Sequence, residues 1–355
     1  MESKEAGNLR RIDWVGALLS IVAMASLVFG LVEGRSYGWW LVNKPFIIGD
    51  WSWSSGISVI PVCFLVFALA TTAFILWGRS RIAAGKPTLI AFNLFGIASF
   101  RNGNVAAMVI SLGEFGIILS LPLWLQFVIG YNALQTGFVI LALAVGAFTA
   151  SGLAGGLGGR VSPVRTVQLG IILEVIGVAA VGFSISPTST WINVVPWLFV
   201  YGLGVGLATA QLTNVILKDV PIQESGQASG TQSTSRQLGS ALGIAILGTI
   251  LFTSAQLQLT NSLTDAGTPP AQVTSIVSAV VDSAGGAIVG FDADPTTRPI
   301  ADLAKQAISD GTRYGAFAAA GFLVLGFFST LALGKSHKDE HEHAPVAEAA
   351  IPSAK

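Results

Sequence analysis

The sequence predicts an all-α, polytopic helical membrane protein with eight transmembrane helices. Apolar residues make up 52% of its 355 residues and charged residues only 11%, whereas soluble domains carry about 25% charged residues. The apolar residues gather in eight stretches, each close to the ~20 residues that a helix needs to cross about 30 Å of hydrocarbon. Because a bilayer offers no water to backbone amides, such stretches cross it as helices. The predicted helices are 14–31, 57–77, 105–129, 136–157, 164–185, 191–212, 238–255 and 314–333.

The connections between these stretches differ in charge, and this difference predicts the orientation. With eight crossings, both termini lie on one side of the membrane. Fourteen of the 19 lysine and arginine residues fall on that side, and the positive-inside rule therefore places both termini in the cytoplasm. We expect a multi-pass protein of the cell (plasma) membrane, with the lipid bilayer as its surroundings. The basic residues predicted outside are Arg35, Lys44, Arg298, Lys305 and Arg313.

The connections also divide the chain into segments. Residues 1–12 form a predicted cytoplasmic segment, and 13–78 hold the first two helices. Lys86, Pro87 and Arg101 interrupt the apolar residues of 79–103, which favours an interfacial amphipathic segment over a ninth crossing. The remaining segments are a six-helix region, 104–334, with an external loop, 256–312, that holds one or two short surface helices, and a disordered cytoplasmic tail, 335–355.

Composition and motifs exclude several classes of function. The net charge is zero, so no nucleic-acid partner is expected. Cys63 is the single cysteine and all three histidines lie in the tail, which leaves no disulfide, metal site or catalytic triad to expect within the membrane. No Walker A sequence is present. The GxGxG of Gly202, Gly204 and Gly206 follows no strand, and glycines in an apolar helix instead favour close helix packing. We expect no enzyme.

Four segments carry a resemblance to a known family. They read IDWVGALLS at 12–20, PLWLQFVIGYNALQTG at 122–137, AGGLGGRVSPVR at 154–165, and GQASGTQSTSRQLGSALGIAILGT at 226–249. In this order they resemble the drug:proton antiporters of the major facilitator superfamily that have fourteen transmembrane helices. The resemblance implies that the eight crossings correspond to the last eight of fourteen. The first two would be the extra helices between the halves, and the other six the C-terminal bundle.

The same resemblance implies a partial fold that lacks the N-terminal bundle, so that an N-terminal half is a missing partner. Met1 falls where the family has its central cytoplasmic linker, which favours a truncated C-terminal portion over one half of a split transporter. The family's cytoplasmic loop motif corresponds to Gly156, Gly159, Arg160 and Arg165, and Gly159 stands where the family usually has an aspartate.

The function that the resemblance implies is secondary active transport. The expected activity is proton-coupled efflux of drugs or other amphipathic small molecules. The proton motive force would supply the energy, and no cofactor is expected. The alternative is a non-transporting membrane scaffold, or a regulatory half-protein that needs a partner.

Two glutamates lie about ten residues into predicted membrane helices and are candidates for proton coupling. An ionised carboxylate at Glu114 or Glu174 costs several kcal/mol at the bilayer midplane, so burial favours a protonated acid that can load and release a proton. A neutral Glu114 bonded to a neighbouring helix is the alternative. Gly170 and Gly177 share the face of Glu174, which equally favours a structural bond between two helices.

Three polar residues are candidates for the substrate path or its gating: Arg236, Gln126 and Asn214. Arg236 opens the seventh apolar stretch, so we expect it at the cytoplasmic mouth. There it would meet an anionic substrate group or a loop carboxylate, Glu224 or Asp219. Ordinary snorkelling to the membrane surface is the alternative. Asp13 precedes the first apolar stretch and is predicted to cap that helix.

Overall fold

The computed structural model of the chain describes residues 13–53, 55–157 and 161–335. Within these residues, eight helices are long and apolar enough to cross a membrane, and each contains most of one predicted stretch. The chain is therefore a multi-pass membrane protein. The eight helices are α1 (Trp14–Tyr37), α2 (Val59–Ala83), α3 (Ala98–Phe127), α4 (Ala133–Leu157), α5 (Pro163–Ser184), α6 (Trp191–Leu217), α7 (Ser225–Asp265) and α10 (Arg298–Lys335).

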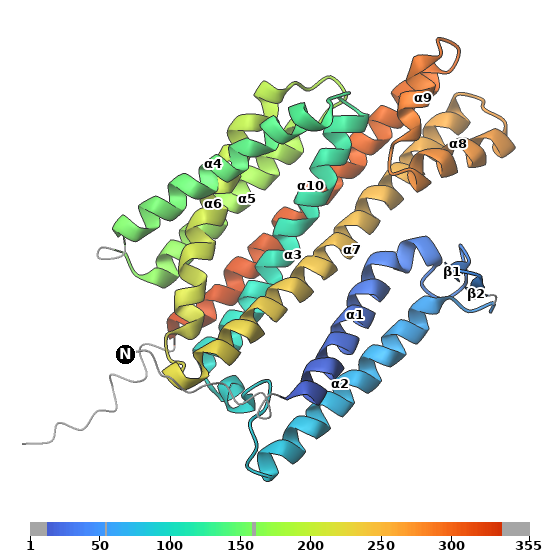
Figure 1. Ribbon diagram of the computed structural model, residues 1–355. Helices are drawn as coiled ribbons and strands as arrows, with labels where there is room; N and C mark the ends of the chain where they lie inside the picture. Colours follow the sequence, from blue (N-terminus) through green and yellow to red (C-terminus); the bar gives the residue numbers. More distant parts are fainter. Residues whose placement is uncertain (1–12, 54, 158–160, 336–355) are drawn as a thin grey trace, which may run out of the picture.

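Helices α3 to α7 and α10 form one bundle made of two groups of three (Figure 1). Helix α6 lies between α4 and α5, while α3, α7 and α10 contact one another; α10 also contacts α5, and α3 also contacts α6. The predicted small residues allow these approaches: Gly202 and Gly206 lie against the backbone of α4, and Gly239 and Gly243 lie against that of α3. Close packing of backbones is what holds membrane helices together, because lipid tails are as apolar as the side chains.

Helices α1 and α2 form a hairpin beside α7 rather than inside the bundle (Figure 1). Asp13 caps α1, as predicted: its carboxylate accepts hydrogen bonds from the Gly16 N–H at 3.0 Å and the Trp77 indole at 2.9 Å, and it lies 3.6 Å from Arg81. Burial alone opposes ionisation of Asp13. The hydrogen bonds from Trp77 and Gly16 and the charge of Arg81 nevertheless hold its pKa below the ordinary value. The cap therefore also joins α1 to α2.

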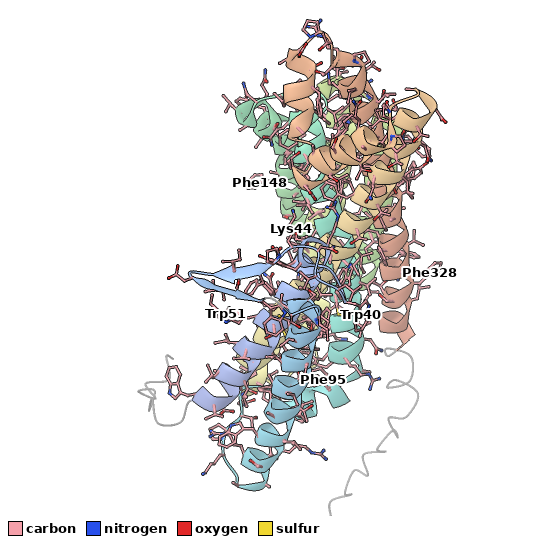
Figure 2. All side chains as sticks on the ribbon, turned by 90° about the vertical axis from the view of Figure 1, so that its right-hand side faces the viewer. Trp40, Lys44, Trp51, Phe95, Phe148 and Phe328 are labelled. Carbon is pink, nitrogen blue, oxygen red and sulfur yellow. The ribbon has the colours of Figure 1, made fainter. Side chains whose placement is uncertain are left out.

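The connection between α1 and α2 is a short β-hairpin, a local feature that the sequence analysis did not predict in this helical protein. Strands β1 (Phe46–Ile48) and β2 (Trp51–Trp53) pair antiparallel, and Gly49 takes the positive φ of 57° that their tight turn requires. A Gly-Asp pair between two short apolar runs is a hairpin signal. Figure 2 shows the hairpin, with Trp51, projecting from the ends of α1 and α2. Lys44, just before it, lies 3.7 Å from Asp282.

The inner linker differs from the amphipathic segment predicted at 79–103. Helix α2 continues to Ala83, a short 3₁₀ helix η2 (Phe92–Gly96) follows, and α3 already begins at Ala98. Leu94 is fully buried, and the Phe92 ring lies against Gly78 of α2. The linker is thus packed against the helices it joins.

The outer connection is shorter than the predicted loop at 256–312, because α7 continues to Asp265 and α10 begins at Arg298. Two short helices lie between them, α8 (Pro270–Asp282) and α9 (Ala287–Ala293). The predicted terminal segments, 1–12 and most of the tail, lie outside the described residues.

Large apolar side chains cover the outside of the bundle, as contact with lipid requires. Phe148 of α4 is 82% exposed and Phe328 of α10 is 59% exposed, and Figure 2 shows them pointing away from the bundle on opposite sides. Helix α1 begins and α10 ends at the same end of the molecule (Figure 1). We call this the inner end, and the end with the β-hairpin, α8 and α9 the outer end.

Candidate functional site

A buried polar cluster lies where α3, α5, α6 and α7 meet. We use the name "polar cluster" for four residues: Glu114 of α3, Glu174 of α5, Tyr201 of α6 and Arg236 of α7. Glu114, Glu174 and Tyr201 lie near the middle of their helices. Both predicted proton-coupling candidates are therefore brought into one place, together with one of the three predicted substrate-path residues.

Arg236 pairs with Glu114 across the interface between α7 and α3. Its Nη2 atom lies 3.5 Å from Glu114 Oε2; the Glu114 side chain is 5% exposed and that of Arg236 is 30% exposed. The ion pair of Arg236 is thus with Glu114, where a loop carboxylate, Glu224 or Asp219, was one expected partner. Glu224 instead accepts hydrogen bonds from the side-chain amide of Asn93 at 3.0 Å.

The reason for this difference is where α7 begins. The helix starts at Ser225, so Arg236 lies eleven residues inside it, about 16 Å along the axis at 1.5 Å per residue. At that depth its guanidinium turns toward Glu114 rather than toward a loop or the membrane surface. The polar run before the apolar stretch is thus part of the helix.

Glu174 is fully buried, and neither of its carboxyl oxygens has a hydrogen-bond partner among the described residues. A side chain at Gly204 of α6 would collide with it, since a Cβ there would lie 2.7 Å from the Glu174 Cγ. Gly170 and Gly177, on the same face of α5, also lie against α6. The predicted close approach of this face is therefore present, but the described residues hold no hydrogen bond from Glu174 to a neighbouring helix.

Tyr201 completes the cluster and was not predicted from the sequence. Its hydroxyl donates to the backbone oxygen of Glu114 at 3.3 Å, and the residue is fully buried. The sequence did contain a signal for it, since Tyr201 is a tyrosine within an apolar helix. A buried tyrosine hydroxyl normally has a hydrogen-bond partner. Through this bond α6 contacts α3. Glu174 also lies within electrostatic range of Glu114 and Arg236, so the cluster joins the two groups of helices.

The other two substrate-path candidates lie outside the polar cluster. Gln126 follows Glu114 by twelve residues on α3, about 18 Å along the helix, near the outer end. Asn214 lies near the inner end of α6, is exposed, and donates within its own helix to the Ala210 backbone at 3.3 Å. The structure thus separates Gln126 from Arg236, whereas Asn214 follows Thr213, whose hydroxyl accepts a hydrogen bond at 2.8 Å from Gln232, one turn before Arg236.

The two described residues of the predicted cytoplasmic loop motif, Gly156 and Arg165, lie at the inner end and outside the cluster. Gly156 lies in the last turn of α4, and Arg165 lies in the first turn of α5, where its N–H donates to the Ser162 hydroxyl at 3.4 Å. Gly159 and Arg160 are outside the described residues. The described part of the chain contains no group of three or more His, Cys, Asp or Glu side chains that fits a metal ion.

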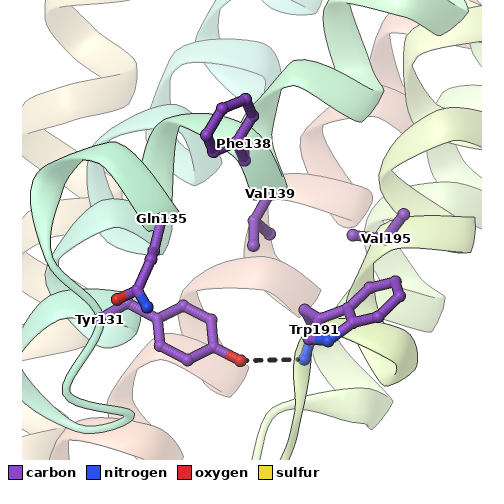
Figure 3. A pocket seen from close by; sticks show the side chains of 6 residues that line it. All are labelled: Tyr131, Gln135, Phe138, Val139, Trp191 and Val195. Carbon is purple, nitrogen blue, oxygen red and sulfur yellow. Dashed lines mark hydrogen bonds between the residues drawn. The ribbon is translucent and has the colours of Figure 1, made fainter.

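An aromatic hollow of about 420 Å³ lies at the outer ends of α4 and α6 (Figure 3). Figure 3 shows the Tyr131 hydroxyl bonded to the backbone N–H of Trp191, at 3.3 Å. The rings offer an apolar surface with one amide beside it, which suits the aromatic part of an amphipathic molecule. Its lining consists of Tyr131, Gln135, Phe138, Val139, Trp191 and Val195.

Comparison with known proteins gives one family and several relatives. The model of the Major Facilitator Superfamily matches residues 10–244. The chain is 28% identical to the multidrug resistance protein Stp of Mycobacterium tuberculosis over 325 residues, which cover 90% of this chain and 56% of that protein. It is 28% identical to a probable actinorhodin transporter of Streptomyces coelicolor over 72% of this chain and 42% of that one. It is 27% identical to multidrug resistance protein 3 of Bacillus subtilis, over 72% and 46%. The chain thus spans about half the length of these relatives.

Proposed function

Because the chain belongs to the Major Facilitator Superfamily, a family of carriers rather than enzymes, we propose that it is part of a proton-coupled exporter of drugs or other amphipathic small molecules. The transporter works in the plasma membrane and draws its energy from the proton motive force. The names of the relatives, two multidrug resistance proteins and a probable actinorhodin transporter, support the substrate class. The observation that carries the proton coupling is the polar cluster.

The cluster contains two buried carboxyl groups and one partly exposed guanidinium. Arg236 compensates the charge of Glu114 at 3.5 Å, whereas Glu174 is buried without a hydrogen-bond partner among the described residues. An isolated carboxylate in such a place costs far more than a neutral acid. The low-energy state therefore has Glu114 ionised and Glu174 protonated, and the cluster stores one exchangeable proton.

Moving that proton changes which helices attract each other. When Glu114 is protonated, its attraction to Arg236 falls and the contact between α3 and α7 weakens. When Glu174 is ionised, the charge on α5 attracts Arg236 instead. Since α5 and α7 belong to different groups of helices, loading and release of the proton bias the bundle between two arrangements. Proton-coupled rocking requires a site of this kind, in which each protonation state favours a different arrangement of the helices.

We further propose that this bundle corresponds to the C-terminal part of a fourteen-helix transporter and works against a second bundle supplied from outside this sequence. The partial coverage of the relatives supports this proposal. The Arg236 side chain is partly exposed at the bundle surface, where it can meet a substrate held between two bundles. The aromatic hollow would then contact substrate on the outer side of the path.

The test replaces each acid by glutamine in the complete protein that contains this sequence. Glutamine keeps the shape but cannot exchange a proton. In liposomes, Glu114→Gln or Glu174→Gln should lower transport driven by a pH gradient by about tenfold or more, because a buried functional acid is lost. Exchange of substrate without a gradient should persist within about twofold, since binding does not need the proton. The substrate is a fluorescent amphipathic cation that the wild type transports.

Glu33→Gln is the matched control, because Glu33 lies in membrane helix α1, away from the cluster; it should behave as wild type. Gradient-driven transport at the wild-type rate in both cluster variants, with proton movement unchanged, would remove Glu114 and Glu174 from the mechanism.

A further inference from the structure

We propose that a pocket at the outer end of α1 binds a phospholipid by its phosphate group, in the leaflet that surrounds this end of the molecule. The pocket has a volume of about 500 Å³ and is formed by the end of α1, the segment before β1 and the end of α8. It shares no lining residue with the polar cluster or the aromatic hollow, so the inference does not depend on the proposed proton coupling. Its polar lining consists of Arg35, Ser36, Asn43, Lys44 and Asp282.

Two cations in this pocket face one carboxylate, and they therefore lie close to each other. The Lys44 ammonium is 3.7 Å from Asp282 Oδ1, and both side chains are more than half exposed. The charge of Asp282 also acts on the Arg35 guanidinium. The pocket thus holds one positive charge more than it holds negative charges, and it is open to the surface. Basic pockets of this kind beside membrane helices favour the anionic head groups of lipids.

The Arg35 guanidinium is held in place but keeps its hydrogen-bond donors free. It lies over the Phe252 ring of α7, with its Cζ atom 4.1 Å from the ring centre, an arrangement that attracts a cation. It donates no hydrogen bond to any of the described residues. A planar guanidinium with free N–H groups matches the geometry of a phosphate and binds two of its oxygens at once.

The turn after α1 brings Asn43 and Lys44 back to Arg35. Gly38 ends the helix with a positive φ of 90°, which glycine adopts without strain. Beyond this turn, the Asn43 backbone N–H donates to the Tyr37 oxygen at 3.0 Å, and its side-chain amide donates to the Arg35 backbone oxygen at 3.5 Å. These bonds satisfy carbonyl groups at the end of α1. They also fix the segment that carries Lys44 beside Arg35.

The pocket lies at the depth where phospholipids carry their phosphates. Arg35 follows Trp14, the first residue of α1, by 21 residues, about 32 Å along the axis at 1.5 Å per residue. The hydrocarbon core is about 30 Å thick, so Arg35 lies at its outer border. Trp40 is 76% exposed and Trp51 is 54% exposed, and Figure 2 shows both at the outer ends of α1 and α2, together with Lys44. Exposed tryptophans are typical of the headgroup layer, which favours a lipid over a free anion.

Asp282 is a weak partner for these cations, so a phosphate can replace it. It is the last residue of α8, where the helix dipole disfavours a negative charge. Its distance of 3.7 Å from Lys44 is too long for a hydrogen bond. A phosphodiester carries one negative charge, as a carboxylate does, but its oxygens can contact Arg35 and Lys44 at the same time. The phosphate and the Asp282 carboxylate therefore compete for the same two cations.

The experiment titrates the purified chain in detergent with phosphatidylglycerol and counts the bound lipids by native mass spectrometry. A diacylglycerol with the same acyl chains lacks the phosphate and is the matched lipid. We expect the first phosphatidylglycerol to bind at least about fivefold more tightly than the diacylglycerol, because contacts between the cations and the phosphate are made only by the former. Equal binding of the two lipids would overturn the proposal. Displacement of phosphatidylglycerol by an equal concentration of inorganic phosphate would assign the pocket to a free anion and contradict the lipid.

Variants of the two lysines at the outer end locate the binding. Lys44→Gln should raise the dissociation constant of the first phosphatidylglycerol about fivefold, since one contact between a cation and the phosphate is lost. Lys305→Gln is the control, because Lys305 also pairs with an aspartate at the outer end, 3.0 Å away, but does not line the pocket. It should stay within about twofold of the wild type. An unchanged affinity in Lys44→Gln would contradict the assignment.

Replacing the competing carboxylate should act in the opposite direction. Asp282→Asn should lower the dissociation constant about threefold, because the phosphate then has no competitor for the two cations. Asp292→Asn, at the other exposed aspartate of an outer ion pair, should leave it unchanged. Tighter binding cannot result from a damaged fold, so this variant separates a specific effect from a loss of structure. Weaker or equal binding in Asp282→Asn would overturn the proposal. Glu114→Gln should bind the lipid as the wild type does, which separates this result from the test of proton coupling.

Discussion

The pair between Arg236 and Glu114 places two opposite charges where neither is stable alone. Removing one partner of a buried pair costs about 3–5 kcal/mol, because the other charge is left uncompensated. Arg236 is 30% exposed, so we expect a value near the lower limit. Arg236→Met should therefore lower the free energy of unfolding by about 3 kcal/mol. Adding Glu114→Gln should recover most of the loss, since a neutral amide then replaces the unpaired carboxylate. Denaturant unfolding of the purified chain in detergent measures both variants beside the wild type.

A surface ion pair supplies the comparison for that measurement. Lys305 lies 3.0 Å from Asp292, which is 46% exposed, and such pairs contribute about 0–1 kcal/mol. Lys305→Met should accordingly change stability little. If Arg236→Met is as mild as Lys305→Met, or if Glu114→Gln fails to rescue it, Arg236 does not compensate a buried charge in the folded protein.

At this scale the sequence located the acids but not their partner. Glu114 and Glu174 were recognisable because a carboxyl group in a long apolar run is rare and costly. Arg236 was visible too, but the polar run 225–237 hides the start of α7, so the residue was assigned to the mouth instead of the interior. Which side chains meet across four helices depends on packing between distant segments. The polar cluster as a unit could therefore not be predicted from the sequence.

Helix contacts in this bundle depend on glycines that let backbones approach. Gly202 of α6 lies against the backbone of α4 at Leu143, so that an added Cβ would collide with the Leu143 carbonyl. Gly202→Ala should therefore cost about 1–3 kcal/mol, as overpacking of a tight interface does. Gly137→Ala, at an exposed position in α4 with nothing within 4 Å, should be neutral or slightly stabilising because alanine favours helices. Thermal unfolding of both variants in the same detergent provides the measurement.

An equal response of the two glycine variants would mean that the α4–α6 interface relaxes around a methyl group. In that case the glycine stripe would reflect flexibility rather than close packing. A larger loss at Gly202 than at Gly137 also predicts that bulkier residues at Gly206, against Ala147, are destabilising in the same way.

The elements that the sequence analysis found have a pattern that covers their whole length, whereas the elements that it missed have only a short local pattern or none. A long apolar run is itself as long as a membrane helix, and the predicted stretches correspond to the helices α1 to α7 and α10. The hairpin of β1 and β2 is short, and its Gly49-Asp50 turn is the only local signal in a segment rich in tryptophan. In the linker at 84–97, Leu94 is buried and Phe92 lies against Gly78 of α2, contacts between segments that a local pattern does not show.

At the scale of the whole molecule, the two ends of the bundle differ in chemistry. The β-hairpin, α8 and α9 gather at the outer end, where Lys44 and Asp282 join two of these elements. Arg79 near the end of α2, Lys86 in the linker and Arg101 in the first turn of α3 gather at the inner end. Basic residues in short connections are held on the cytoplasmic side during insertion. This asymmetry predicts which end of the molecule faces the cytoplasm.

The orientation can be measured with single cysteines in a Cys63→Ser background, since Cys63 is the one native thiol. Lys44→Cys and Asp292→Cys should react with an impermeant thiol reagent on intact cells. Lys86→Cys and Arg160→Cys should react only after permeabilisation, because they lie among the basic residues that stay inside. Lys44 and Asp292 are themselves exposed in their ion pairs, and the loss of such a pair costs about 1 kcal/mol or less, so the fold should tolerate both changes. Labelling at 86 or 160 in intact cells, or none at 44 and 292, would contradict this orientation. The end that we call inner would then face the outside of the cell.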